Sequence, residues 1–285
     1  MLLDSQRRFF AEELEAVANL RTPGLVDAFA AVPRERFLDE GPWILKSDAD
    51  VGGPGRRSTD ADPRRVYHNV AIAIDNERQL FNGMPGFVAM CLDSLGLEPG
   101  DRVLHVGCGL GYYTAVIAHC VGSSGLVVGV EVDENLATRA AANLDSMPWA
   151  EVRHGDATSL PGESFDAVLI NAGVTHPLPA WLDALERGGR MALPITATMP
   201  AMGPTIGKGI MVLLTNGDRG SSLAARTLTF VAIYSAIGIR DESLNARIGQ
   251  ALSRMPFPRL QTLRRDPHEA GPACWLHGEG FCFGT

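Results

Sequence analysis

Three glycines at alternate positions, Gly107, Gly109 and Gly111, separate the apolar run "RVLHV" from "YYTAVIAHCVG". The first run is typical of a buried strand and the second of a helix, so the glycines form a strand-to-helix turn. Glycine lets a ligand approach the main chain and meet the N–H groups of the helix N-terminus. The dinucleotide pattern G-x-G-x-x-G has its third glycine where Tyr112 stands here, so the G-x-G-x-G spacing favours another ligand. A tight turn without a ligand is the alternative.

Two acidic residues stand at the ends of the next two predicted strands. Glu131 closes "LVVGVE", and Asp156 follows "AEVRHG". At the carboxyl end of a parallel strand, an acid can accept hydrogen bonds from both hydroxyls of a ribose. Either acid alone would also suit a helix cap or a solvated loop. The glycine turn and the two acids, in this order on successive strands, predict a ligand that contains a ribose.

The stretch Gly107-Cys108-Gly109-Leu110-Gly111 resembles motif I of the class I S-adenosylmethionine (SAM) methyltransferases. This resemblance implies SAM as the cofactor and S-adenosylhomocysteine as the product. It places the main chain of the loop, Cys108 included, against the cofactor. It also implies that Glu131 holds the ribose, and that Asp156 with the adjacent Ala157 meets the adenine.

His105 lies two residues before the first glycine. In the methyltransferases that the motif resembles, this position usually carries Glu or Asp, which helps to hold the methionine part of SAM. Histidine can accept a hydrogen bond through one ring nitrogen and donate through the other, so we expect His105 to replace the acid in part. A strand histidine bonded to the backbone is the alternative.

Longer stretches resemble the protein-L-isoaspartate O-methyltransferase family over residues 25–45 and 67–195. They are "AFAAVPRERFLDE", "PGFVAMCLDSLGLEPGDRVLHVGCGLGYYTAVIA" and "SFDAVLINAGVTHPLPAWLDALERGGRMALPI". The resemblance implies carboxyl O-methylation of a peptide or protein acceptor of the isoaspartyl type.

The family carries a stretch like T-I-S-x-P, whose serine lies beside the transferring methyl group. Here the stretch is "FNGMP", which places Gly83 at the serine position and Asn82 before it. We expect this loop, with Asn82 as the nearest donor, to position the acceptor. A loop of another shape, next to a divergent insertion, is the alternative. Asn171, at the end of "FDAVLIN", is a further candidate for orienting the acceptor, with a strand-end cap as the alternative.

Methyl transfer to a carboxylate needs no general base, because the acceptor is already ionised at neutral pH. The chain has "NAGVTH" where amino-methylating relatives carry "[DN]PP[YF]". This difference disfavours methylation of adenine N6 or of glutamine. His176 would serve as a base only for a hydroxyl or amine acceptor, and a surface histidine is the alternative.

The C-terminal stretch "CWLHGEGFC" holds Cys274, His277 and Cys282. Their spacing suits zinc, but three ligands without an obvious fourth do not complete a tetrahedral site. We therefore predict no metal site, and a final strand or hairpin that buries Trp275 and Phe281.

Short apolar runs alternate with helical patterns from about residue 85 onward, with Asp133 as the N-cap of the helix "ENLATRAAANL". They predict a Rossmann-like, doubly wound α/β fold. Its sheet would be mostly parallel and seven-stranded, with helices on both faces. We expect a turn at "ERGG" and a late amphipathic helix with Leu244, Ile248, Leu252 and Met255 on one side.

The predicted domains are an N-terminal extension, 1–84, and a SAM-binding methyltransferase domain with a divergent C-terminal part, 85–285. The extension would be helical over 5–32, with a break at "RTPG". It would carry a mobile loop over 46–65, which is rich in Gly, Pro, Ser and charge.

The composition of the chain disfavours nucleic acid and membrane as partners. The net charge of −8 argues against a broad basic face for nucleic acid, and a hydrophobic content of 46% divided into short runs predicts no membrane span. The N-terminus is typical of an amphipathic helix and not of a signal peptide. Five sparse cysteines indicate reduced thiols in the cytoplasm. No pattern sets an oligomeric state.

The sequence thus predicts a SAM-dependent carboxyl O-methyltransferase acting on a peptide or protein. The alternatives are an O-methyltransferase of a small metabolite or of a modified biosynthetic peptide, a non-catalytic SAM-fold binding module, and a tRNA adenine methyltransferase. The acidic charge disfavours the last.

Overall fold

The computed structural model describes residues 2–50, 53–198, 205–217 and 222–285. The chain divides into two compact units, one made of residues 1–101 and 108–155 and the other of residues 102–107 and 156–285. Among the described residues, no helix has both the length and the apolar character needed to cross a bilayer.

The helices and 3₁₀ turns follow the predicted order along the chain. They are α1 (Leu2–Ala18), α2 (Pro23–Ala31), η1 (Arg34–Phe37), η2 (Pro63–Val66), α3 (Pro85–Leu95), α4 (Tyr112–Val121), α5 (Glu134–Asn143), α6 (Pro179–Asp183) and α7 (Glu242–Arg254). Proline lies in the first turn of α2, α3 and α6. Proline has no backbone N–H, and the N–H groups of the first turn have no hydrogen-bond partner within the helix, so no bond is lost. Asp133 caps α5 as predicted, by accepting from the N–H of Leu136 at 2.9 Å.

The strands form one small sheet and one large one. They are β1 (Ile44–Lys46), β2 (Arg56–Arg57), β3 (Ala71–Asp75), β4 (Leu80–Phe81), β5 (Arg102–Val106), β6 (Leu126–Glu131), β7 (Ala150–His154), β8 (Phe165–Ile170), β9 (Leu185–Thr198), β10 (Ile206–Thr215), β11 (Ser222–Tyr234), β12 (Thr262–Arg264), β13 (Cys274–Gly278) and β14 (Phe281–Gly284). The small sheet has the order β2-β1-β3-β4, and the large sheet has the order β13-β14-β12-β11-β10-β9-β8-β5-β6-β7.

The α/β architecture is as predicted, but the seven-stranded, mostly parallel sheet is wrong. The large sheet has ten strands and is mixed. Strand pairs β5/β8, β6/β7 and β8/β9 are parallel. The pairs β9/β10, β10/β11, β11/β12, β12/β14 and β13/β14 are antiparallel. The reason is that only residues 199–205 join β9 to β10, and only residues 216–221 join β10 to β11. These connections are shorter than the crossover of about a dozen residues that a parallel pair needs, so the strands pair antiparallel.

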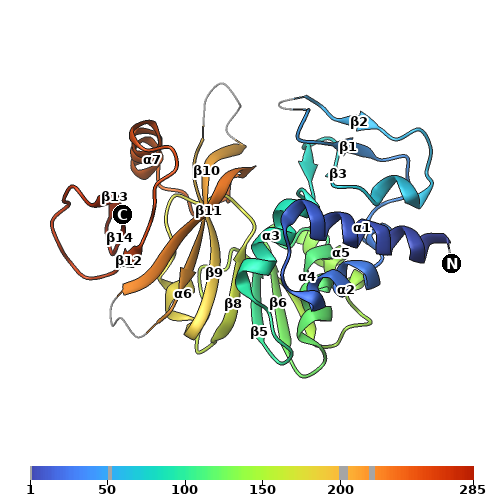
Figure 1. Cartoon of the computed structure of the whole chain (residues 1–285), viewed down its shortest axis with the longest axis horizontal. Helices are drawn as coiled ribbons and strands as arrows, with labels where there is room; N and C mark the ends of the chain where they lie inside the picture. The colour runs from blue at the N-terminus through green and yellow to red at the C-terminus, as the bar shows by residue number, and fades with distance from the viewer. Residues whose placement is uncertain (1, 51–52, 199–204, 218–221) are drawn as a thin grey trace. The chain divides into compact units, whose positions relative to one another are not determined.

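In the first unit, α1 packs on α2 and α3, α2 packs on α4, and α5 packs on β6 and β7 (Figure 1). The break between α1 and α2 confirms the one predicted at "RTPG". The segment 46–65, expected to lack structure, contains β2 and the start of η2, although residues 51–52 lie outside the described part. Ser58 anchors it by accepting from the Trp43 N–H at 2.9 Å and donating to the Asp60 carbonyl at 2.8 Å.

In the second unit, α6 and α7 both pack on β9, and α7 also packs on β13. The predicted "ERGG" turn is wrong, because Gly188, at φ +83°, lies inside β9. The apolar face of α7 contains Leu244, Ile248 and Ala251. The predicted Met255 is 44% exposed, because it lies just beyond the end of the helix.

Candidate functional site

The glycine turn adopts a backbone that requires glycine at each of its three positions. Gly107, Gly109 and Gly111 have φ values of +78°, +56° and +89°. In this left-handed region a Cβ atom meets the following carbonyl oxygen, at a cost of about 1–2 kcal/mol per residue. At Gly111 a Cβ would also lie 3.1 Å from Leu144 Cδ1. The turn therefore leads directly into α4 without side chains on its ligand-facing main chain.

In the first unit, the acid at the end of β6 contacts this turn. Glu131 is only 7% exposed, and its carboxylate accepts from the N–H of Gly109 at 2.8 Å and from the N–H of Asp133 at 3.1 Å. Each carboxylate oxygen has two lone pairs, so both retain a position for a second donor. The expected role of Glu131 in holding a ribose stays a prediction.

Cys108 is buried beneath the turn rather than exposed in it. Its N–H donates to the Val130 carbonyl at 3.2 Å, and a Cβ on Gly129 would lie 3.2 Å from its Sγ atom. Burial raises the pKa of the Cys108 thiol, so it stays protonated. Cys108 thus contributes its backbone and its volume, and not a reactive sulfur.

Two predicted site residues of the first unit lie between β4 and α3. Gly83 has φ +83°, and its carbonyl accepts from the Tyr113 hydroxyl at 3.1 Å. The side-chain oxygen of Asn82 accepts from the N–H of Ile72 at 2.9 Å and from Arg34 at 3.4 Å. The amide oxygen of Asn82 is therefore engaged within the unit, which leaves its NH₂ group as the donor for an acceptor.

In the second unit, Asn171 follows β8 and caps the end of β5. Its N–H donates to the Val106 carbonyl at 2.8 Å, and its side-chain NH₂ lies 3.4 Å from the Gly107 carbonyl. A Cβ on Gly107 would lie 3.3 Å from the carbonyl oxygen of Asn171, so the glycine is also needed for this close approach. The strand-end cap weighed in the sequence analysis is present. The role in orienting the acceptor stays a prediction.

Asp156 and Ala157 form a turn in the second unit. The exposed Asp156 carboxylate accepts from the N–H of Thr158 at 3.0 Å and from its hydroxyl at 2.7 Å, and these bonds lower its pKa. Ala157 is buried with φ +55°, and its carbonyl accepts from the indole N–H of Trp181 at 2.8 Å. A non-glycine residue in this region stores strain that the surrounding contacts must hold, which is common at ligand sites.

His105 and His176 differ in surroundings within the second unit. His105 is fully buried in β5, and burial lowers its pKa to about 3. His176 is half-buried, stacks on Phe281 with ring centroids 6.1 Å apart, and lies 3.0 Å from the Thr175 hydroxyl through Nδ1. Burial lowers the pKa of His176, opposed by the charge of Asp241.

The low pKa of His105 predicts a pH-dependent stability. Between pH 6.5 and about 3, the unfolded chain takes up a proton at this side chain that the native chain does not. Stability is therefore retained above pH 6.5 and falls below it, by up to about 1.4 kcal/mol per pH unit. We expect His105→Asn to flatten this slope when urea unfolding is compared at several pH values from 6.5 downward. An equal slope in this variant and in the exposed-site control His119→Asn would contradict the assignment.

Comparison with known proteins gives three findings. The family model "Protein-L-isoaspartate(D-aspartate) O-methyltransferase" matches residues 57–203, just over half of the chain. "Protein-L-isoaspartate O-methyltransferase 1" of Archaeoglobus fulgidus is 30% identical over 244 residues, which cover 84% of this chain and 98% of the relative. "Protein-L-isoaspartate O-methyltransferase" of Serratia proteamaculans is 32% identical over 180 residues, which cover 62% and 74%.

Solved structures agree on the fold. A structure named "protein-L-isoaspartate O-methyltransferase" superposes with a TM-score of 0.63 at 23% identity, covering 86% of this chain and 68% of its own. A putative protein-L-isoaspartate O-methyltransferase from Plasmodium falciparum, in complex with S-adenosyl-L-homocysteine, gives a TM-score of 0.60 at 18% identity, with coverages of 81% and 97%. The resemblance expected from the motifs is thereby confirmed: the chain belongs to the protein-L-isoaspartate O-methyltransferase family, and it is a SAM-dependent methyltransferase.

Proposed function

We propose that the chain transfers the methyl group of SAM to the free carboxylate of an isoaspartyl residue in a peptide or protein. The observation that carries this proposal is the buried Glu131 carboxylate, bonded to the N–H of Gly109 in the three-glycine turn. Together with the family membership, this contact supports a SAM site at the turn. The proposed catalytic domain is 85–285, with 1–84 as an extension.

Each predicted cofactor residue has a stated role in this proposal. Glu131 accepts hydrogen bonds from the ribose hydroxyls through its remaining lone pairs. Asp156 accepts from the adenine amino group, and the backbone at Ala157 lies beside the base. The neutral His105 supports the methionine end from within β5 and does not take a charge there.

The acceptor chemistry suits the residues proposed to position it. Bound SAM supplies a methyl group on a positively charged sulfur. A carboxylate acceptor needs orientation and exclusion of water rather than deprotonation. Asn82, Gly83 and Asn171 do not titrate, so they can orient the acceptor through N–H groups without acting as a base.

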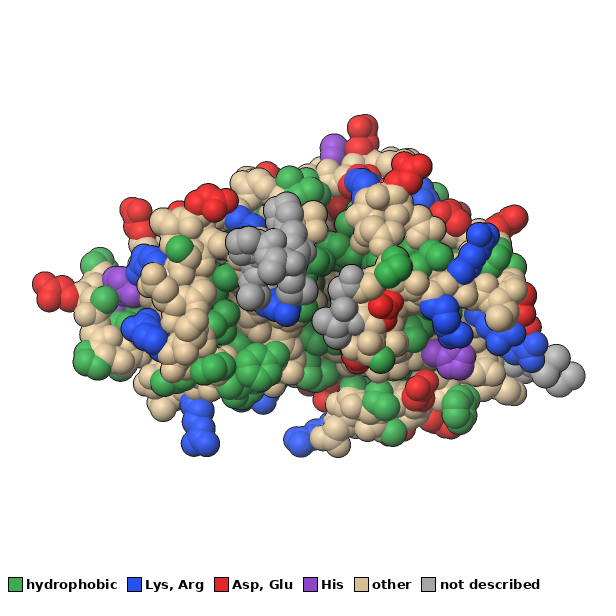
Figure 2. All heavy atoms as spheres, turned by 90° about the horizontal axis from the view of Figure 1, so that it is seen from above, with side chains coloured by type: hydrophobic (Ala, Val, Ile, Leu, Met, Phe, Trp, Pro, Cys, Tyr) green, Lys and Arg blue, Asp and Glu red, His purple; other side chains and the backbone are tan. Residues whose placement is uncertain are grey.

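Charge supports a peptide or protein as the acceptor. Acidic and basic side chains are intermixed over the face seen in Figure 2, where a nucleic-acid site would favour a continuous basic surface. We expect the enzyme to act in the cytoplasm, where its cysteine thiols stay reduced.

Gly83 favours a second candidate acceptor. It replaces the serine expected from the family resemblance, and its φ of +83° disfavours a side chain there. Without that hydroxyl the loop leaves room for an acceptor of another shape. The second candidate is therefore a small metabolite or a modified biosynthetic peptide carrying a carboxylate or hydroxyl.

The test uses two peptides that differ only in one linkage, isoaspartyl or ordinary aspartyl. With radiolabelled SAM, we expect a base-labile methyl ester on the isoaspartyl peptide, released as methanol, and none on the aspartyl peptide. Calorimetry with S-adenosylhomocysteine checks that the protein binds its cofactor. Cofactor binding with transfer only to components of a cell extract would overturn the isoaspartyl acceptor in favour of the second candidate.

A further inference from the structure

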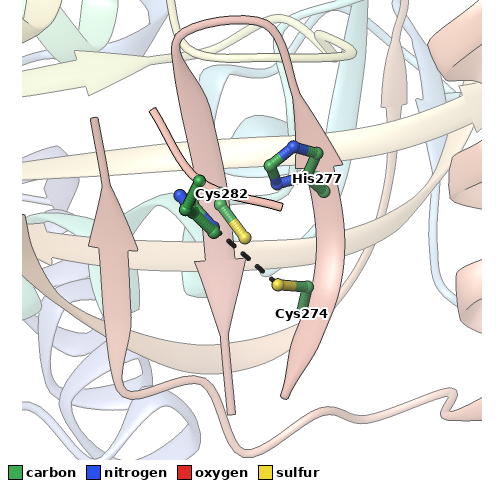
Figure 3. Close-up of side chains that lie close together, drawn as sticks. Cys274, His277 and Cys282 are labelled. Carbon is green, nitrogen blue, oxygen red and sulfur yellow. Dashed lines mark hydrogen bonds between the residues drawn. The ribbon is translucent and has the colours of Figure 1, made fainter. Parts of the chain in front are cut away.

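Four metal-ligating side chains converge at the C-terminal end of the second unit. Cys274 and His277 come from β13, Cys282 comes from β14, and His268 comes from the loop that precedes β13. Their potential ligand atoms all lie within 4.8 Å of one another. Figure 3 shows the side chains of Cys274, His277 and Cys282 directed toward one another from the hairpin. The sequence alone offered three ligands, from which no metal was predicted, and the fold brings His268 beside them as a fourth candidate.

The hairpin brings its three ligands to one face by a local irregularity. His277 pairs directly with Cys282 across the two strands, so these side chains share a face. Cys274 stands three residues before His277, a spacing that places side chains on opposite faces of a regular strand. The register shift between Cys274 and Leu276 changes this phase and returns Cys274 to the same face.

The two histidines are already arranged as ligands. Nδ1 of His268 lies 2.8 Å from the Asp266 carbonyl and donates to it, which leaves the Nε2 lone pair aimed at Cys274 Sγ, 3.9 Å away. Such an outer hydrogen bond fixes the tautomer of most metal-bound histidines. Nδ1 of His277 is buried with no hydrogen-bond partner among the described residues. The two imidazole rings lie with their centroids 4.8 Å apart.

The cysteines also suit a metal. The N–H of Gly271 lies 3.3 Å from Cys274 Sγ and donates to it, as a backbone N–H does to a metal-bound thiolate. Cys282 is buried, so an unpaired thiolate there would be unfavourable without a cation beside it. A bound cation would thus stabilise both sulfurs as thiolates.

We propose that His268, Cys274, His277 and Cys282 bind one zinc ion in a closed, structural site. Two thiolates and two imidazoles form a tetrahedral donor set typical of zinc. Zinc–sulfur and zinc–nitrogen distances of about 2.3 and 2.0–2.1 Å correspond to ligand separations of about 3.3–3.8 Å, so only a small contraction is needed. Four protein ligands leave no open position for a substrate, and the site acts on structure rather than on methyl transfer.

The ion would order the loop 269–273, which few other interactions stabilise. Residues 269–273, between His268 and Cys274, are all exposed, so hydrophobic burial contributes little to their order. In the described part of the chain, β13 is the outermost strand of the large sheet and pairs with β14. Zinc would cross-link this loop to both strands of the terminal hairpin.

The test is the metal content of the full-length protein, purified without chelators after growth in zinc-supplemented medium. Mass spectrometry of the metal is expected to find about one zinc per chain, and below about 0.1 in His268→Ala and Cys274→Ser. Both positions are partly exposed, so these variants are expected to fold. The matched controls His119→Ala and Cys120→Ser, both in α4, keep the full zinc content.

Two further measurements distinguish a zinc site from a cluster without metal and from a disulfide. After zinc is removed, cobalt(II) is expected to give the visible spectrum of a tetrahedral thiolate site, absent in Cys274→Ser. Chelation is expected to speed protease cleavage within 269–273, because the exposed loop would lose its cross-link to the hairpin. A folded wild-type protein that binds S-adenosylhomocysteine but holds no zinc after reconstitution would overturn the site. So would a Cys274–Cys282 disulfide, detected as an intact mass lower by two hydrogens and located by peptide mapping. Because methyl transfer is not measured, failure here leaves the proposed function untouched.

Discussion

Glu131→Ala is expected to raise the dissociation constant for SAM by about 100-fold or more. Hydrogen bonds to a charged group contribute about 1.5–3 kcal/mol each, and two ribose hydroxyls would lose their acceptor. The same substitution removes the contact that holds the N–H of Gly109, so the turn itself loosens. Calorimetric titration with SAM and with S-adenosylhomocysteine measures the effect directly.

Glu131→Gln sharpens this prediction because it keeps the shape and removes the charge. The carboxylate accepts from a backbone N–H on each oxygen, so the NH₂ of a glutamine would face one of these donors. We expect Glu131→Gln to resemble Glu131→Ala more than wild type. The exposed Glu134, three residues along the chain in α5, provides the matched control, and Glu134→Ala should bind normally. A folded Glu131→Ala protein with wild-type affinity would remove the basis of the proposed site.

The second large effect concerns Arg34, which is fully buried in the first unit. Its guanidinium donates to the carbonyls of Val66 at 2.7 Å, His68 at 3.1 Å and Val70 at 2.8 Å. Arg34→Ala would remove the donor from the Val66 and Val70 carbonyls and create a cavity, whereas the His68 carbonyl keeps the N–H of Val70 at 2.7 Å. We expect the free energy of unfolding to fall by about 3–5 kcal/mol, measured as a lower urea midpoint at unchanged slope.

Arg34→Lys tests whether the forked geometry matters as well as the charge. Lysine keeps the charge but cannot present the planar set of donors that reaches three carbonyls, so we expect an intermediate loss of stability. Arg36→Ala is the control, since this exposed arginine lies in the same 3₁₀ turn, η1. Because Arg34 also contacts Asn82, methyl transfer by the surviving folded protein should slow. Wild-type stability of Arg34→Ala would show that the buried contacts are dispensable.

Several features of this protein follow from short stretches of sequence. Asp133 caps α5, proline starts α3, and the three glycines adopt the left-handed backbone because each depends on its own conformational preferences and on nearest neighbours. The family resemblance rests on such local stretches too. The terminal hairpin with buried Trp275 and Phe281 was predictable for the same reason.

Other features depend on residues far apart in the chain. The sequence predicted that Asn82 positions the acceptor. Only the fold shows that its side-chain oxygen accepts hydrogen bonds from the Ile72 N–H and the Arg34 guanidinium. The ten-strand width of the sheet and the antiparallel pairing from β9 onward were missed, because an apolar strand sequence does not specify its partner strand or the direction of pairing.

By itself the sequence determined the family, the cofactor, the glycine turn and the acids that follow it. Each of these can be recognised from a short contiguous stretch of residues. Only the tertiary structure decided that Glu131 meets the N–H of Gly109, that His105 is fully buried, and that His268 completes a four-ligand cluster. The physical reason is that a register shift of one residue, as between Cys274 and Leu276, reverses which side chains share a face. Hydrophobic alternation alone does not encode that shift.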